Sequence, residues 1–283
     1  MDQWLINGDI ADSIPAGDRG LAYGDGLFET IAVRANKTRF LRQHLARLEL
    51  GCKRLGLAYP GDAILGNEVH QLAAGRPHAV IKIIITRGIG PRGYAADPSE
   101  SPHRLVGVSA TEAHPADYYL SGVSVVRCST RVSRNPLLAG MKTLNRLEQV
   151  LARAEWRSPK IAEGLMFDEH ENLISGVMSN VFLVADGALL TPGLSHSGIA
   201  GTMRQRVIDV WLKQGLQIAE CTITPELFSE ASEMFLTNAL IGLWPVTKID
   251  ARQYSVGDFS RRTMTLLAAA GVIECSASAK AGA

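Results

Sequence analysis

The sequence lacks a surplus of charge of either sign. It has 29 Lys and Arg residues against 28 Asp and Glu residues, which leaves a formal net charge of +1. Proteins that bind nucleic acid or an anionic membrane surface usually carry a basic excess on one face. We therefore expect neither nucleic acid nor a membrane as a partner, and the charge balance favours a small-molecule substrate.

Long apolar runs are missing as well. Met1 begins a polar segment that has neither the basic start nor the apolar stretch of a secretory leader, and no later run approaches the ~20 residues of a membrane span. We expect a cytoplasmic protein.

Metal-binding and disulfide patterns are also absent from the sequence. The cysteines lie far apart and form no CxxC pair, which argues against a zinc knot or a disulfide framework. No HExxH pair or similar spacing occurs among the seven histidines, so we expect no metal. Each cysteine is interpreted as a reduced packing residue; they are Cys52, Cys128, Cys221 and Cys275.

The chain is long enough to form two domains. With 283 residues, of which 46% are hydrophobic, the chain can bury a large core, and chains of this size are often divided. The pattern breaks at His114-Pro-Ala-Asp117, so we predict a small N-terminal α/β domain over 1–115 and a larger domain over 121–275, with a disordered tail over 276–283.

Periodicity predicts several elements. Apolar residues at spacings of three and four from Arg42 to Leu55 indicate an amphipathic helix, and β-branched residues from Ala79 to Thr86 indicate a central strand. By the same reasoning we expect strands at Gln3–Asn7, Thr30–Val33, Val123–Cys128, Glu163–Phe167, Asn180–Ala185 and Met234–Leu236, and helices at Asn145–Trp156 and Thr202–Gln214.

A glycine pattern follows the Ala79–Thr86 run. Gly88-Ile-Gly-Pro-Arg-Gly93 spells a dinucleotide fingerprint, but that motif requires a helix to open at its third glycine. Pro91 interrupts the turn, and the following Tyr94-Ala-Ala-Asp-Pro98 is unsuited to starting a long helix. We interpret this stretch as a glycine-rich loop over an active site, with Arg87–Asp97 as a lid.

Several separated motifs instead share one explanation. Lys142 stands between the loop Asn135-Pro-Leu-Leu-Ala-Gly140 and the start of a helix. Near the N-terminus lies Asp18-Arg-Gly-Leu-Ala-Tyr-Gly-Asp-Gly-Leu-Phe-Glu-Thr30, and after the lysine follow Gly198-Ile-Ala-Gly-Thr-Met-Arg204 and Leu236-Thr-Asn-Ala239. Together with His44-Leu-Ala-Arg47 they resemble the fold-type IV pyridoxal-phosphate enzymes, over roughly Gln3 to Val246. The family contains branched-chain and D-amino-acid aminotransferases and aminodeoxychorismate lyases.

The resemblance implies a mixed α+β/α/β, two-domain fold of the D-amino-acid aminotransferase type, with pyridoxal 5'-phosphate at the domain interface, and a homodimer. Lys142 would carry the cofactor and act as the catalytic base. The resemblance further implies that Arg47 and the loops around the phosphate bind the cofactor. The cofactor-binding residues implied in this way are Arg47, Lys142, Ser175, Asn180, Ile199, Ala200, Thr237, Asn238 and Ala239.

The residues around Lys142 indicate the branch of the family. Lys142-Thr-Leu-Asn-Arg-Leu-Glu-Gln-Val150 is similar to the aminodeoxychorismate lyases rather than to the aminotransferases. This implies elimination of pyruvate from aminodeoxychorismate, leaving 4-aminobenzoate for folate synthesis. The substrate carries two carboxylates, so we expect cationic or donor-rich groups around it; the candidates are Arg92, Tyr94, Asn145 and Arg146. Phe28 is a further candidate for contact with the substrate.

One position departs from the family pattern. The glutamate that pairs with the pyridine nitrogen usually lies five residues before the asparagine of Ser179-Asn180, and here that position is Ser175. A serine hydroxyl stabilises a protonated ring nitrogen less than a carboxylate does. We interpret the change as favouring elimination over transamination. The alternatives are a D-amino-acid or branched-chain aminotransferase, and a cofactor-binding protein without useful catalysis.

Overall fold

The computed structural model describes residues 3–96 and 101–276, and it divides the chain into two compact units. The first comprises Met1–Ala113 together with Met141–Arg146, and the second comprises His114–Gly140 and Leu147–Ala283. The division therefore departs from the two continuous ranges predicted from the sequence, because the segment that carries Lys142 belongs to the first unit. Residues 277–283 of the predicted tail and Asp97 of the predicted lid lie outside the described residues.

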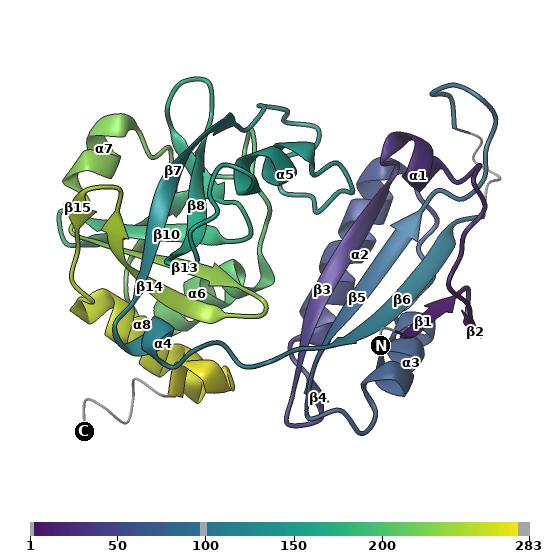
Figure 1. The fold of residues 1–283 in the computed structure, drawn as a ribbon, viewed down its shortest axis with the longest axis horizontal. Coiled ribbons are helices and arrows are strands. Elements are labelled where there is room, and N and C mark those ends of the chain that lie inside the picture. Colours follow the sequence, from purple (N-terminus) through teal and green to yellow (C-terminus); the bar gives the residue numbers. More distant parts are fainter. Residues whose placement is uncertain (1–2, 97–100, 277–283) are drawn as a thin grey trace. The chain divides into compact units, whose positions relative to one another are not determined.

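The first unit is built on a six-stranded sheet in the order β2-β1-β6-β5-β3-β4, in which every neighbouring pair is antiparallel. Its described elements are β1 (Gln3–Ile6), β2 (Asp9–Ile10), α1 (Arg19–Tyr23), β3 (Gly26–Arg34), β4 (Lys37–Thr38), α2 (Leu41–Leu55), α3 (Asp62–Ala73), β5 (His78–Thr86) and β6 (His103–Ala110). Helices α2 and α3 lie on one face of the sheet (Figure 1).

Alternation along β3 decides which side chains face the helices. Leu27, Ile31 and Val33 join the core of the unit with Leu45 and Leu48 of α2, as expected when successive strand residues point to opposite faces. Residue 29 lies in the same helix-facing row but is a glutamate, which is buried. A charged group in this apolar layer requires partners.

The second unit contains a nine-stranded sheet in the order β12-β11-β10-β13-β14-β7-β8-β9, with β15 paired to β14. Its described strands are β7 (Val123–Arg131), β8 (Ile161–Phe167), β9 (Leu173–Gly176), β10 (Asn180–Ala185), β11 (Ala188–Pro192), β12 (Ile218–Cys221), β13 (Glu233–Asn238), β14 (Gly242–Ile249) and β15 (Arg252–Gln253). Its described helices are α4 (Asp117–Leu120), α5 (Leu147–Arg153), α6 (Thr202–Lys213), α7 (Pro225–Glu230), α8 (Asp258–Ala269) and the 3-10 helix η1 (Ile273–Cys275).

Buried aliphatic and aromatic side chains fill this unit. Phe182 of β10 stacks on Phe235 of β13 with ring centroids 5.0 Å apart. The sheet mixes parallel pairs, such as β7 with β8, with antiparallel pairs, such as β10 with β13. Sheets that combine parallel and antiparallel pairs are common in units that contain both helices and strands.

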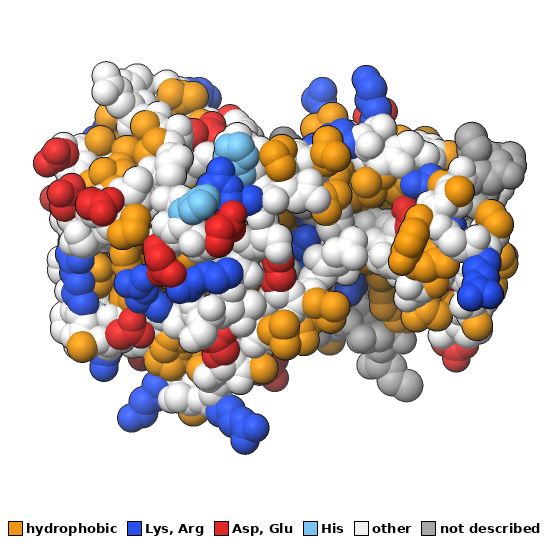
Figure 2. All heavy atoms as spheres, turned by 90° about the horizontal axis from the view of Figure 1, so that it is seen from above, with side chains coloured by type: hydrophobic (Ala, Val, Ile, Leu, Met, Phe, Trp, Pro, Cys, Tyr) orange, Lys and Arg blue, Asp and Glu red, His pale blue; other side chains and the backbone are white. Residues whose placement is uncertain are grey.

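The surface agrees with the charge balance of the sequence. On the face shown in Figure 2, acidic and basic side chains lie intermixed, and no broad field of one sign appears. Among the residues that the structure describes, no helix is long and apolar enough to cross a membrane.

Candidate active site

Lys142 is held at the edge of β3 by backbone hydrogen bonds. The amide of Phe28 donates to the carbonyl of Lys142 at 3.0 Å, and the amide of Leu144 donates to the carbonyl of Gly26 at 3.0 Å. A Cβ on Gly26 would lie 2.8 Å from a methyl carbon of Leu144 and 2.4 Å from the carbonyl oxygen of Ile85. A glycine here thus leaves room for the backbone of β5 and for the Leu144 side chain of the lysine segment.

The amine of Lys142 lies over an aromatic ring. Its Nζ is 4.0 Å from the centroid of the Phe28 ring. Burial and the nearby Arg47 cation lower the pKa of Lys142 to about 7, against an opposing effect of Glu29. A substantial fraction of the amine is therefore neutral, and nucleophilic, at neutral pH.

Glu29, His44 and Arg47 form a buried network beneath β3. Arg47 donates from Nε to Glu29 Oε1 at 2.7 Å and from Nη2 to Oε2 at 2.5 Å, and His44 Nδ1 lies 2.6 Å from Oε2. Burial would raise the pKa of Glu29, but Arg47 and His44 lower it to about 2. The carboxylate is therefore ionised and can only accept, which places the Nδ1 hydrogen on His44.

This network explains the position of Arg47. The resemblance implied that Arg47 binds the cofactor near its phosphate. The structure places it in a two-point ion pair on α2, one helical turn from His44. Glu29 and His44 were missed as members of the site, although a glutamate in the apolar row of β3 was a signal that could have found them.

In the second unit, three segments predicted to bind the cofactor meet. Asn180 pairs with Thr237 across β10 and β13, and its Nδ2 donates to the carbonyl of Ile199 at 2.8 Å. Gly201 precedes α6, and a Cβ there would lie 1.9 Å from Asn180 Oδ1. The helix begins at Thr202, as predicted, so its amino end joins the same group of residues.

Thr237 has a feature that suits a ligand. Its side chain is completely buried, and its Oγ1 makes no hydrogen bond to the described part of the protein. A buried hydroxyl without a partner costs about 1–3 kcal/mol, so such groups are uncommon unless something binds them.

The other predicted ligands of this unit are engaged within the protein. The amide of Ala200 donates to the carbonyl of Gly140 at 3.0 Å. Asn238 donates from Nδ2 to the carbonyl of Met178 at 3.1 Å, and its Oδ1 accepts from the amide of Leu240, in the turn that includes Ala239. These residues fix the shape of the loops around Thr237.

Ser175 lies on β9 opposite Met166. A nearby carboxylate, Glu163, accepts from the amide of Met178 at 3.0 Å and from Ser179 Oγ at 3.0 Å. Burial raises the pKa of Glu163. Sequence reasoning missed this residue, which holds the turn between Ser175 and Asn180.

The predicted substrate ligands all belong to the first unit. Phe28 lies under Lys142, Asn145 donates from Nδ2 to the carbonyl of Gly24 at 3.2 Å, and Arg146 donates to Thr143 Oγ1 at 3.0 Å. Arg92 and Tyr94 are exposed on the loop after β5. No helix begins in the described residues 91–96, so the helix that a dinucleotide fingerprint requires does not start at Gly93.

A family model described as amino-transferase class IV matches residues 26–249 of the chain. The chain belongs to this family, and the predicted family membership is confirmed.

Two relatives are lyases. The aminodeoxychorismate lyase of Vibrio harveyi is 34% identical over 263 residues, which cover 91% of this chain and 96% of that protein. The crystal structure of 4-amino-4-deoxychorismate lyase from Pseudomonas aeruginosa superposes with a TM-score of 0.89 at 44% identity and covers 93% of this chain and 97% of that one.

A third relative shares the fold at lower identity. The branched-chain amino acid aminotransferase of Escherichia coli superposes with a TM-score of 0.85 at 22% identity and covers 96% of this chain and 94% of that one. These superpositions confirm the predicted fold-type IV architecture.

Proposed function

We propose that the protein is a pyridoxal-phosphate-dependent aminodeoxychorismate lyase that releases pyruvate and leaves 4-aminobenzoate. The observation that carries the proposal is the placement of Lys142 at the edge of β3, with its amine over Phe28 and its pKa lowered to about 7. The names of the Vibrio harveyi and Pseudomonas aeruginosa relatives support the choice of reaction.

The residues present suit the cofactor. Its phosphate is a dianion, which binds best to guanidinium groups, hydroxyls and the amino ends of helices. The first unit offers Arg47. The second offers the buried, unpartnered hydroxyl of Thr237 and the start of α6 at Thr202, with Asn180 and Ile199 alongside. The aldehyde would bind the amine of Lys142. When bound, the cofactor supplies an electron sink next to the amine-bearing carbon of the substrate.

The chain's own part in the reaction centres on the Nζ of Lys142. Once the substrate's amine has replaced it at the cofactor, this atom is a free amine and can accept the proton from the ring carbon that bears the substrate's amine. The C–O bond to the enolpyruvyl group then breaks, and the ring becomes aromatic. The departing enolpyruvate gains one proton and becomes pyruvate, so the products together contain the atoms of the substrate. Because aromatisation provides driving force, the base has to remove one proton and need not return it to the ring.

Recognition of the substrate rests on cations and donors in the first unit. The two carboxylates call for guanidinium groups, and we assign Arg92, Arg146 and the donor Asn145 to them, with Tyr94 beside Arg92 and the Phe28 ring beneath the reacting carbon. Asn145 and Arg146 follow Lys142 by three and four residues, and the Arg146 cation lies near enough to lower the pKa of Lys142.

An aminotransferase is the second candidate, because the matching family model is described by that activity. Ser175 favours the lyase, since a hydroxyl beside the pyridine nitrogen leaves a weaker sink than a carboxylate does. Reversible transamination needs the stronger sink, whereas elimination is helped by aromatisation. A protein that binds the cofactor without useful catalysis is the remaining alternative.

A product assay tests the proposal. Purified protein is supplied with aminodeoxychorismate made in place and, separately, with D-alanine or leucine plus 2-oxoglutarate. We expect 4-aminobenzoate and pyruvate in equal amounts, and a loss of at least about 10²–10⁴ in rate for Lys142→Ala. Lys53→Ala, which removes an exposed lysine from α2, is the matched control.

Other products would contradict the proposal. Glutamate formed from the amino acids without 4-aminobenzoate would identify an aminotransferase. A coloured protein that is inert toward every amine would identify a cofactor-binding protein.

We also propose that the protein forms a homodimer. Helix α5 exposes an apolar face formed by Leu147, Val150 and Leu151, and Leu137 is exposed in the same unit. Exposed apolar side chains that cluster on one helix face often mark an interface. Sedimentation should give a dimer that Val150→Glu dissociates, while Leu212→Glu, at an exposed apolar position of α6, leaves it intact. A monomeric wild-type protein would contradict this.

The reaction also places the protein in a sequence of steps. An upstream synthase must make aminodeoxychorismate, and 4-aminobenzoate would serve folate synthesis in the cytoplasm. A strain lacking this chain should then require 4-aminobenzoate for growth, and growth without it would contradict this role.

A further inference from the structure

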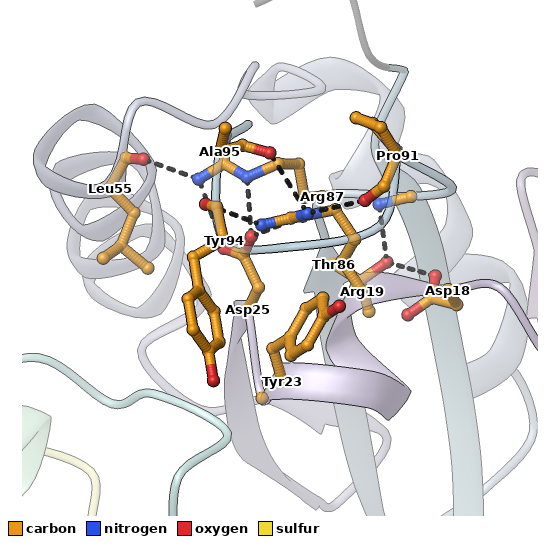
Figure 3. Close-up of polar contacts among 12 residues, drawn as sticks. Asp18, Arg19, Tyr23, Asp25, Leu55, Thr86, Arg87, Pro91, Tyr94 and Ala95 are labelled. Carbon is orange, nitrogen blue, oxygen red and sulfur yellow. Dashed lines mark hydrogen bonds and ion pairs between the residues drawn. The ribbon is translucent and has the colours of Figure 1, made fainter. Parts of the chain in front are cut away.

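The buried guanidinium of Arg19 holds a loop by its backbone. Arg19 lies at the start of α1 and is only 3% exposed. Its Nη1 and Nη2 donate to carbonyl oxygens of the loop after β5: Pro91 at 3.4 Å, Gly93 at 2.9 Å, Tyr94 at 3.2 Å and Ala95 at 3.3 Å. Figure 3 shows the Arg19 side chain with Pro91, Tyr94 and Ala95 around it. A planar guanidinium suits this use because it presents five donors in a fixed geometry.

Asp25 joins Arg19 to a second arginine. Its Oδ2 accepts from Arg19 Nε at 3.0 Å and from Arg87 Nε at 2.7 Å. Arg87 also donates to the carbonyls of Leu55 and Gly56 at 2.9 and 3.0 Å, at the carboxyl end of α2. Burial would raise the pKa of Asp25, but the hydrogen bonds from Arg87 and Arg19 lower it. The base of the loop is thereby tied to the helix that carries Arg47.

Asp18 fastens the two strands that flank the loop. Its Oδ2 accepts from Thr86 Oγ1 at 2.6 Å, at the end of β5, and lies 2.6 Å from His103 Nδ1, at the start of β6. Its Oδ1 caps α1 by accepting from the amide of Leu21 at 3.1 Å. One carboxylate therefore fixes both ends of the loop and the start of the helix that carries Arg19.

The segment Gly24–Gly26 also holds the residues around Lys142. Gly24 accepts from the side chain of Asn145 and Gly26 accepts from the amide of Leu144, while Asp25 between them anchors the two arginines. The opening motif of the chain therefore contacts both the segment that carries Lys142 and the loop that carries Arg92.

We infer that Arg19 is a positioning residue, which with Asp18 and Asp25 holds residues 91–95 of the loop in one conformation and presents Arg92 and Tyr94 to the dicarboxylate substrate. The inference rests on the proposed function. The loop turns its carbonyl oxygens toward Arg19, and its side chains are left for a ligand: Arg92 is exposed, and Tyr94 is 87% exposed with its ring 5.5 Å from that of Tyr23.

The test compares Arg19→Met and Arg19→Lys with a matched control. Arg34 is also a buried arginine of the first unit that donates to backbone carbonyls, those of Val33 and Ala79, at the far end of β3. Arg34→Met thus removes a buried guanidinium without touching the loop. For each holoenzyme we would measure KM and kcat for aminodeoxychorismate, the absorbance of the bound cofactor, and the rate of tryptic cleavage after Arg92.

Arg19→Met should raise KM about tenfold or more while kcat changes by less than about threefold, because a misplaced binding loop weakens substrate binding before it alters the base. Cleavage after Arg92 should accelerate, and the cofactor absorbance should stay the same. Arg19→Lys should have a KM and a cleavage rate between those of wild type and Arg19→Met. An ammonium group keeps the positive charge but not the planar set of donors of a guanidinium. Arg34→Met should lower the stability of the protein and leave KM, kcat and the rate of cleavage after Arg92 at their wild-type values.

The inference is overturned if Arg19→Met shows the KM and the cleavage rate of Arg34→Met, or if it lowers kcat and leaves KM unchanged. Should Arg19→Met fail to fold, Arg19→Lys and Asp25→Asn decide by the same measurements. A wild-type protein that does not turn over aminodeoxychorismate would contradict the proposed function instead, and the cleavage rates would still show whether Arg19 holds the loop.

Discussion

The carboxylate of Glu29 and the guanidinium of Arg47 face each other in a two-point ion pair within the layer between β3 and α2, with nitrogen to oxygen distances of 2.7 and 2.5 Å. The pair fixes the Arg47 cation in an apolar layer, and we propose that this cation binds the phosphate of the cofactor. Loss of either partner leaves a buried charge uncompensated, which strongly lowers the stability of the folded state.

Glu29→Gln should weaken both folding and cofactor binding. The pKa of Glu29 is lowered from 4.5 to about 2, so its ionised form contributes about 3 kcal/mol of stability above pH 4.5, lost as the pH falls toward 2. The free energy of unfolding of Glu29→Gln should therefore be lower by about this amount at pH 7, and the difference from wild type should shrink below about pH 4.5. Urea titrations of both proteins measure this.

The control for Glu29→Gln is Glu68→Gln, because Glu68 pairs with Arg104 at 2.8 Å in the same unit. We expect cofactor affinity to fall about tenfold or more in Glu29→Gln and to stay at the wild-type value in Glu68→Gln. Equal affinity in all three proteins would contradict the role assigned to Glu29.

The second prediction concerns the pH dependence of Lys142. With a pKa lowered from 10.5 to about 7, the amine of the apoprotein should react with pyridoxal phosphate with a midpoint near pH 7. The charged groups that act on its pKa are Arg47, Glu29, Arg146 and Lys82. Of these, Glu29 raises the pKa of Lys142, so Glu29→Gln should move the midpoint to lower pH. Borohydride trapping followed by mass spectrometry gives the midpoint, and a value near that of a surface lysine would disprove the assignment.

A lowered lysine pKa also affects stability. Because the folded state disfavours the charged amine, Lys142 lowers the free energy of unfolding, and this loss is complete below pH 7. The loss shrinks as the pH rises from 7 toward 10.5. Lys142→Met should remove that part of the pH dependence from the free energy of unfolding of the apoprotein.

The third prediction separates folding from cofactor binding at Thr237. Thr237→Val keeps the shape and removes a buried hydroxyl that has no partner in the described protein. The apoprotein should be equally stable or gain up to about 1 kcal/mol, while cofactor affinity should fall about tenfold.

Thr191→Val is the matched control, because Thr191 is equally buried but donates to the carbonyl of Val181 at 2.8 Å. This variant should lose stability and keep its cofactor affinity. If Thr237→Val binds the cofactor as tightly as wild type, its hydroxyl is not a phosphate ligand.

The fourth prediction addresses Ser175. Ser175→Glu should strengthen the electron sink and raise the rate of transamination relative to that of elimination. Ser175→Gln, which matches the size without the charge, should leave the ratio of the two rates near the wild-type value. Unchanged rates of both reactions in Ser175→Glu would argue against the interpretation of this position.

Local pattern predicted a good part of the fold. The helix expected at Arg42–Leu55 is α2 (Leu41–Leu55), and the strand expected at Asn180–Ala185 is β10 with the same bounds. Both segments could be predicted because the pattern of their apolar residues is strong. Helix α3 and strand β6 were missed; in β6, Gly107 lies in a short stretch with little clear alternation.

Contacts between distant segments were beyond local pattern. Lys142 was recognised from its motif, but its pairing with Phe28 joins residues more than a hundred positions apart, which no window of the sequence displays. The role of Arg19 was hidden for the same reason, since its partners are backbone carbonyls, and any residue types could supply them.

The late return of Met141–Arg146 to the first unit has a consequence for synthesis on the ribosome. Met141 belongs to the hydrophobic core that the sheet and helices of residues 5–108 otherwise complete. At about 5–20 residues per second, the nascent chain reaches Lys142 roughly 1.5–6 s after Ala113. During that interval Gly26 and Phe28 at the start of β3 lack the backbone hydrogen bonds that they make with Leu144 and Lys142. The segment that completes these bonds brings the reactive amine.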